Sequence, residues 1–145
     1  MKKVRQEEIN FTNINKFFHN AVKKFYKAKK VLLFDEETAY QMFYESMLKA
    51  SLALMLSYGT RPRSLPGHHI VIIEYTTNKL GKKYLETMNL FDRMRRKRNK
   101  MIYEADIGIT KTEAITALKI TEEYLTIIRN HINKNNPQLK LNFKH

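Results

Sequence analysis

The residues best suited to chemistry in this chain lie in one short run, from Asp92 to Glu104. Six of the eight residues from Arg93 to Lys100 are cationic, and four of those six are arginines. A guanidinium can form two parallel hydrogen bonds with a phosphate, so an arginine-rich run suits phosphate better than a lysine-rich one. The run therefore indicates binding to a polyanion such as a nucleic acid.

Helical geometry divides this run into two faces. At about 100° per residue, Arg98 falls on one stripe with the apolar residues Phe91, Met94, Met101, Ile102 and Ala105. A polar stripe beside it carries Asp92, Arg95, Arg96, Asn99, Tyr103 and Asp106. Because the apolar stripe should face the rest of the protein, Arg98 is expected at the inner edge of a polar site. The expected contacts to nucleic acid are the other five cations, Arg93, Arg95, Arg96, Lys97 and Lys100.

The charge of the whole chain supports this expectation. The formal net charge is +13, and nine of the 27 cations lie between Lys79 and Lys100. Such a charge attracts polyanions before any specific contact forms. Nine further cations lie between Met1 and Lys30, where two interpretations stay open: a second polyanion contact, or a lysine-rich surface that only meets solvent.

Composition excludes several classes of protein. The chain has no cysteine, so disulfides, a thiol nucleophile and thiolate metal sites are excluded. No apolar run approaches the roughly 18 residues of a membrane span, and no apolar leader follows the first residues. The protein is expected to be cytoplasmic, without a membrane association and without a cofactor.

The elements that must position these residues are helices. With 145 residues and only four glycines and three prolines, the chain favours one all-α domain, an antiparallel four- to five-helix up-and-down bundle. Apolar spacing predicts a core over about 12–134, with helices over about 12–32, 36–58, 68–80, 82–106 and 111–134. The second helix is apolar on most of its circumference and should be the centre of the bundle.

Local signals set the helix ends. Asp35 and the pair Thr110 and Glu113 have the spacing of N-terminal caps. The stretch 60–67 is predicted as a mobile basic loop, and the β-branched stretch 68–75 is assigned to a helix because no second strand is expected for it. The tail, residues 135–145, offers few core residues and is expected to be frayed.

Four features of the chain, taken together, resemble the HEPN superfamily of small helical proteins. They are, in order, a very apolar second helix, Gly59-Thr60-Arg61-Pro62, Gly67-His68, and Arg98-Asn99 with Tyr103-Glu104. The resemblance covers about residues 14–132. It implies a bundle that forms a homodimer and acts as a metal-independent endoribonuclease on RNA. It also implies a toxin–antitoxin pair, in which a minimal nucleotidyltransferase is the antitoxin.

The active members of that superfamily carry an arginine followed four to six residues later by a histidine. Arg98 and Asn99 match the start of the motif, but Tyr103 stands in the histidine position. By this resemblance the catalytic residues are Arg98, which would stabilise phosphorane charge, Asn99, which would orient the substrate, and Tyr103, which would donate a hydrogen bond. A phenol is not a base at pH 7, so a histidine from elsewhere, such as His68, would have to move protons.

This departure leaves three readings of function open. The chain cleaves RNA; or it binds RNA or a nucleotide, or docks a nucleotidyltransferase, without cleavage; or it is an adaptor whose charge only aids solubility. Residues five apart on a helix point about 140° from each other, so Arg98 and Tyr103 cannot face one small ligand unless the helix bends or ends between them. A two-fold dimer would also bring them together, because Arg98 of one protomer can face Tyr103 of its partner. In the alternative structural role, Arg98 pairs with Glu45 or Glu104. No metal site is expected at His68 and His69, because adjacent residues on a helix diverge.

Overall fold

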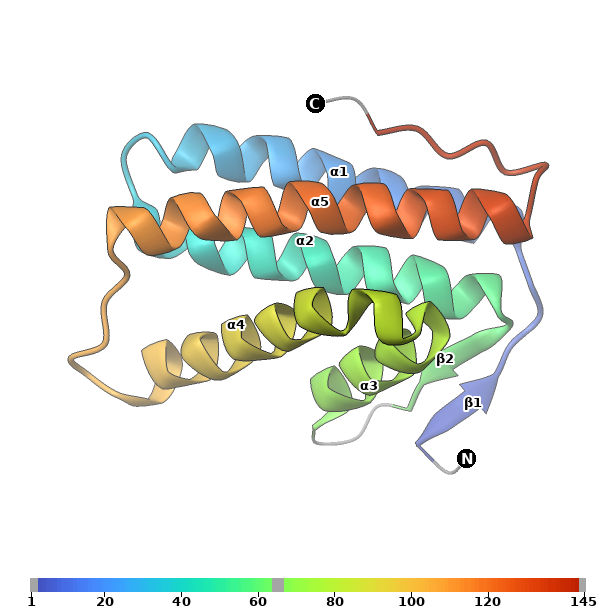
Figure 1. Cartoon of the computed structure of the whole chain (residues 1–145), viewed down its shortest axis with the longest axis horizontal. Coiled ribbons are helices and arrows are strands. Elements are labelled where there is room, and N and C mark those ends of the chain that lie inside the picture. The colour runs from blue at the N-terminus through green and yellow to red at the C-terminus, as the bar shows by residue number, and fades with distance from the viewer. Residues whose placement is uncertain (1–2, 64–66, 144–145) are drawn as a thin grey trace.

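The computed structural model describes residues 3–63 and 67–143 and confirms a mostly α-helical bundle (Figure 1). The helices are α1 (Phe11–Val31), α2 (Glu36–Ser57), α3 (His68–Leu80), α4 (Leu85–Tyr103) and α5 (Lys111–Asn135), with a 3-10 turn η1 (Lys82–Tyr84) before α4. Among the described residues, none of the helices is both long enough and apolar enough to cross a membrane.

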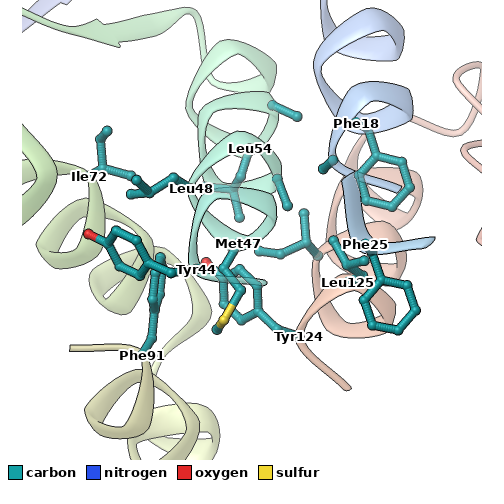
Figure 2. Packing of buried hydrophobic residues seen from close by; sticks show 14 of the residues in the cluster. Phe18, Phe25, Tyr44, Met47, Leu48, Leu54, Ile72, Phe91, Tyr124 and Leu125 are labelled. Atoms are coloured by element: carbon teal, nitrogen blue, oxygen red, sulfur yellow. The ribbon is translucent and has the colours of Figure 1, made fainter. Parts of the chain in front are cut away.

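Helix α2 is the centre of the bundle, as its composition predicts. It packs against α1, α3, α4 and α5. Figure 2 shows Phe18 and Phe25 of α1 on one side of α2, and Ile72 and Phe91, from α3 and α4, on the other. A helix that is surrounded in this way must be apolar on all faces, which explains why the sequence of α2 shows little amphipathic contrast.

The predicted helix caps are present. Asp35 Oδ1 accepts a hydrogen bond of 3.0 Å from the amide of Thr38 at the start of α2. At the start of α5, Thr110 Oγ1 accepts from the amide of Glu113 at 3.1 Å, and Glu113 Oε1 accepts from the amide of Thr110 at 3.0 Å. These bonds satisfy amide groups that a helix leaves without partners, so the start of each helix is specified locally.

The expected loop after α2 is partly a strand. Strand β1 (Val4–Gln6) pairs antiparallel with β2 (Thr60–Pro62), with Arg5 opposite Arg61. Arg61 also forms an ion pair with Glu7 at 3.2 Å. The prediction of a loop over residues 60–62 is wrong. The partner strand lies more than 50 residues away and carries no apolar pattern, so nothing local indicates the pairing. Residues 64–66 of the expected loop lie outside the described part of the chain.

Helix α4 ends earlier than expected. Its last residue is Tyr103, and Glu104 already has an extended backbone with φ −123 and ψ 135. The prediction had placed the end near Asp106, but Ala105 and Asp106 are exposed and bring no side chain into the core. Without burial, nothing offsets the entropy cost of another helical turn.

The C-terminal tail is not frayed over its described length. Leu139, Leu141 and Phe143 are buried, at 7%, 5% and 4% exposure. The backbone of Leu141 exchanges two hydrogen bonds with the side chain of Asn133, at 2.7 and 2.9 Å, and Arg129 donates to the Phe143 carbonyl at 3.1 Å. The alternate spacing of these three apolar residues is typical of an extended segment, which a search for helical spacing overlooks.

Candidate functional site

Arg98 lies in α4 where that helix faces α2 and α3. Its guanidinium carbon is 5.9 Å from the centre of the Tyr44 ring. Its Nε atom is buried and has no hydrogen-bond partner among the described residues. Burying a guanidinium N–H without an acceptor is costly. This N–H is therefore well suited to donate a hydrogen bond to an anionic oxygen of a ligand.

The structure does not bear out the alternative structural role of Arg98. Glu45 pairs with Lys24, with Nζ and Oε2 separated by 3.4 Å. Within residues 3–63 and 67–143, Arg98 forms no ion pair with Glu45, with Glu104 or with any other carboxylate. Its charge is therefore not neutralised by a direct contact within the described chain.

An imidazole does reach this place, and it belongs to His69 in the first turn of α3. The Tyr44 hydroxyl and His69 Nδ1 are 3.1 Å apart, within hydrogen-bond distance. The His68 ring stands edge-on to the His69 ring, with 4.6 Å between their centres. His68 is the candidate that the sequence suggests as a substitute for the missing motif histidine, but its neighbour His69 is the one that contacts Tyr44, beside Arg98.

Burial and the positive charges around it keep His69 neutral. Burial first, and then His68, Arg98 and Arg95, together lower the pKa of His69 to about 4, while Glu45 acts in the opposite direction. Burial also raises the pKa of Tyr44 far above its usual range, and the charge of Arg98 partly opposes this. At neutral pH both side chains are uncharged, so Arg98 and Arg95 dominate the local charge.

A column of aromatic rings holds Tyr44 in place (Figure 2). The Tyr44 ring lies against the Phe91 ring at 5.6 Å, and Phe91 lies against Tyr124 at 5.1 Å. Deeper still, the Tyr124 hydroxyl is hydrogen-bonded to the hydroxyl of Ser51. Because each ring is packed against the next, Tyr44 presents its hydroxyl to His69 from a rigid position.

Three of the cations predicted to contact nucleic acid are engaged by carboxylates. Arg95 and Arg96 both contact Asp92, at 2.8 and 3.4 Å, and Lys97 contacts Glu113 at 3.3 Å. Arg95 is mostly buried with its side chain 16% exposed, whereas Arg96 is 62% exposed. Asp92 thus holds Arg95 on the side of the helix where Arg98 also lies.

The five predicted cations do not form one surface. Arg93 lines a pocket of about 240 Å³ between α2, α4 and α5, together with Tyr40 and Glu113. Arg95 acts instead on His69 and Tyr44, and Lys100 is exposed to solvent. Residues three or four apart on a helix share a face, so Arg95 accompanies Arg98 while Arg93 accompanies Lys97.

Tyr103 and Asn99 are not brought to Arg98 within one chain. Tyr103 is 83% exposed at the last turn of α4. Asn99 is partly buried and forms no side-chain hydrogen bond in the described part of the chain. The helix stays regular between positions 98 and 103, so the divergence expected from a five-residue separation persists.

Tyr44 and His69 belong to this site, although the sequence did not indicate either of them as a neighbour of Arg98. Tyr44 is fully buried in an apolar helix, where an aromatic residue indicates core. His69 had the right chemistry, but only the packing of α3 against α4 brings it near Arg98. No spacing in the sequence could have indicated that contact.

Comparison of the sequence with protein-family models found no match, and comparison with curated proteins found no significant relative. Among the described residues, no group of three or more histidine or acidic side chains is arranged to hold a metal ion.

Proposed function

We propose that this protein is a HEPN-type endoribonuclease that binds RNA between α2, α3 and α4 and cleaves it without a metal ion. The observation that carries the proposal is that His69 and Arg98 both contact Tyr44, His69 at the hydroxyl and Arg98 over the ring. An arginine and an imidazole are the two groups that the HEPN motif supplies. Here Tyr103 occupies the motif position of the imidazole, and His69 provides an imidazole from another helix.

The chemistry assigns one role to each group. His69 accepts the proton of the ribose 2′-hydroxyl, whose oxygen attacks the neighbouring phosphorus. The bond from phosphorus to the 2′ oxygen forms as the bond to the 5′ oxygen breaks, which leaves a 2′,3′-cyclic phosphate and a 5′-hydroxyl. His68, whose ring touches His69, supplies the proton to the leaving oxygen. Arg98 stabilises the extra negative charge of the phosphorane.

Substrate binding adjusts the basicity of His69. Burial, together with His68, Arg98 and Arg95, holds its pKa down in the free protein. A phosphodiester bound at Arg98 places a negative charge in that field, and a nearby opposite charge favours the protonated imidazole. The pKa of His69 therefore rises when RNA binds, which brings it closer to the range in which a general base works at neutral pH.

The resemblance to HEPN proteins supplies the wider proposal. The protein acts in the cytoplasm as a homodimer and as the toxin of a toxin–antitoxin pair, restrained by a minimal nucleotidyltransferase. In the dimer, Tyr103 and Asn99 of one protomer approach Arg98 of its partner and complete a shared cleft. A small nucleotidyltransferase encoded in the neighbouring reading frame would support this role.

One observation favours a second candidate function, in which the same site binds RNA or a nucleotide, or docks the nucleotidyltransferase, without cleavage. A histidine with a pKa near 4 is a weak base. If bound phosphate does not raise that pKa, the site holds the ligand and leaves it intact.

The experiment that separates the two functions uses purified protein, labelled single-stranded RNA and excess chelator. Cleavage to products with 2′,3′-cyclic phosphate ends is expected for the wild type. It should fall by roughly 10²-fold or more in Arg98→Ala, because a preorganised charge is lost, and comparably in His69→Ala. His19→Ala is the matched control, since His19 is exposed on α1.

The outcomes are distinct. RNA that binds in an Arg98-dependent way but stays intact supports the second candidate function. Cleavage that persists in both Arg98→Ala and His69→Ala contradicts the site itself. Equal loss of cleavage in His19→Ala also contradicts it, because the effect would then not depend on the position of the imidazole.

A further inference from the structure

A second basic surface lies away from Arg98, in a groove of about 480 Å³ between α1 and α2. Its lining includes five lysines and one aromatic residue, namely Lys23, Lys24, Lys27, Lys30, Lys49 and Tyr26. We refer to it as the lysine groove. The first of the two charge clusters in the sequence thus contributes to a concave surface, which favours a ligand over simple exposure to solvent.

The charges of the lysine groove are largely uncompensated. Within the described parts of the chain, Lys24 alone of the five lysines has a carboxylate partner, Glu45 at 3.4 Å. Like charges gathered in a hollow repel one another and raise the local concentration of a polyanion. Lys23, Lys27 and Lys30 follow one another at helical spacing along α1 and span about 10 Å, so each of the three can contact a phosphate of one nucleic-acid strand.

An aromatic side chain stands beside these lysines. The Tyr26 ring packs edge-on against the Phe25 ring, with 5.5 Å between the ring centres. It also contacts the tilted ring of Phe143 in the C-terminal tail, with 6.1 Å between the centres. Two ring contacts hold Tyr26 in one orientation while part of it stays accessible in the groove. Lysines with a fixed aromatic ring are the combination that binds single strands, through phosphate contacts and base stacking.

Glu45 joins the lysine groove to the Arg98 site. It pairs with Lys24 of the groove, and its charge also acts on His69. Glu45 and Lys49 are four residues apart on α2 and share a face of that helix. Glu45 therefore links the two basic surfaces through α2.

We infer that the lysine groove binds the phosphate backbone of the single-stranded RNA whose scissile phosphate lies at Arg98. This inference rests on the proposed function and extends it: the substrate is a strand several nucleotides long, and Tyr26 stacks one of its bases. Glu45 lies between the two contacts, where its negative charge repels a phosphate and so sets the register of the strand.

The test measures binding of fluorescent single-stranded RNA of about four and about 12 nucleotides at several salt concentrations. The groove variant is Lys23→Ala, Lys27→Ala and Lys30→Ala combined. The matched control removes the same charge at exposed positions outside the groove, with Lys16→Ala, Lys111→Ala and Lys119→Ala combined. Alanine favours helices, so the triple alanine variant should fold, and a melting curve verifies this. If its melting is no longer cooperative, the same three lysines are replaced by glutamine instead.

The expected result depends on RNA length. The groove variant binds the longer RNA at least tenfold more weakly. Its affinity also depends less on salt: the negative slope of log affinity against log salt becomes shallower by about two, because about three phosphate contacts at 0.7 each are lost. Its affinity for the short RNA changes less than twofold. The control variant shows no such dependence on length.

Four outcomes would overturn the inference, and a fifth would overturn the proposed function. The lysine groove does not bind the RNA strand if the groove variant weakens binding equally for both RNA lengths, or if the control variant weakens binding as much as the groove variant does. The same follows if a polyglutamate peptide competes as strongly as RNA. If short RNA binds through Arg98 while the groove variant behaves as wild type, the groove inference fails alone. If RNA of neither length binds the wild type, the proposed function fails.

Discussion

The hydroxyl of Tyr44 lies 3.1 Å from Nδ1 of His69 and ties the middle of α2 to the first turn of α3. Tyr44 also lies beneath the guanidinium of Arg98. One buried phenol therefore positions both the imidazole and the arginine of the proposed site. Its ring is held by the core, so the geometry of the site depends on the packing of the bundle.

Tyr44→Phe should separate the role of the hydroxyl from that of the ring. The phenylalanine ring keeps the contact with Phe91 at 5.6 Å and loses only the hydrogen bond to His69. Unfolding free energy is expected to fall by about 0.5–1.5 kcal/mol, while RNA cleavage falls about tenfold because His69 loses its orientation. Thermal melting and cleavage rates measure the two effects. Cleavage at the wild-type rate would show that Tyr44 does not position His69.

Stability should depend on pH through His69. Its pKa is about 4 in the folded protein against 6.5 for an unperturbed histidine, so the unfolded chain binds more protons between these values. Stability is therefore fully present above about pH 6.5 and is lost as pH falls towards 4. The loss attributable to His69 is about 1–2 kcal/mol, because the side chain is only half-buried and solvent screens it.

Melting curves from pH 4 to 7 test this dependence. His69→Gln should lose less stability on acidification than the wild type does, and His19→Gln should behave as the wild type. His131 acts in the same direction, since burial together with Lys134 and Lys79 lowers its pKa. A double variant of His69 and His131 is expected to flatten the curve further. An acid profile of His69→Gln that matches the wild type would contradict the buried, neutral state of His69.

Arg98→Ala should fold with nearly normal stability. Loss of the contact with the Tyr44 ring costs about 0.5–1 kcal/mol, whereas an orphaned buried carboxylate would cost about 3–5 kcal/mol. The melting temperature should therefore drop by only a few degrees while cleavage is lost. Arg98→Lys should rescue poorly, because an ammonium cannot form the paired hydrogen bonds of a guanidinium. Early melting with no RNA phenotype beyond the instability would assign Arg98 a structural role.

A two-fold dimer at micromolar concentration is expected from light scattering, with α4 near the axis. Ile102 and Tyr103 are 47% and 83% exposed at the end of this helix, an unusual place for large apolar side chains. Ile102→Asp should weaken the dimer tenfold or more. Leu85→Asp is a matched control, because Leu85 is also 47% exposed but lies at the other end of α4. A wild-type monomer would remove the shared cleft from the proposal.

The C-terminal tail should contribute to stability. Phe143→Ala is expected to lower the unfolding free energy by about 3 kcal/mol, since the ring is 4% exposed and packs against Phe25 at 5.5 Å. Asn142→Ala, at an exposed neighbouring position, should change it by less than about 0.5 kcal/mol. Chemical denaturation measures both values. Equal effects would indicate that the tail does not pack as described.

Local chemistry in the sequence was sufficient for the helical part of the fold. The Asp35 cap and the Thr110–Glu113 capping box were predictable because a cap is formed by residues three apart. The apolar surplus of α2 likewise indicated a central helix. The strand pairing of Arg5 with Arg61 and the packing of Phe143 were missed, because each joins segments far apart in the chain.

The candidate site divides in the same way. The sequence alone determined that a cationic run lies on a helix and that Arg98 shares the stripe of its apolar residues, since both follow from the turn per residue. Only the tertiary structure decided which imidazole lies near Arg98, which cations Asp92 and Glu113 engage, and that five lysines share a groove with Tyr26. Those contacts depend on how α1, α3 and α4 pack around α2, and the packing is set by the shape of the whole core rather than by any local spacing.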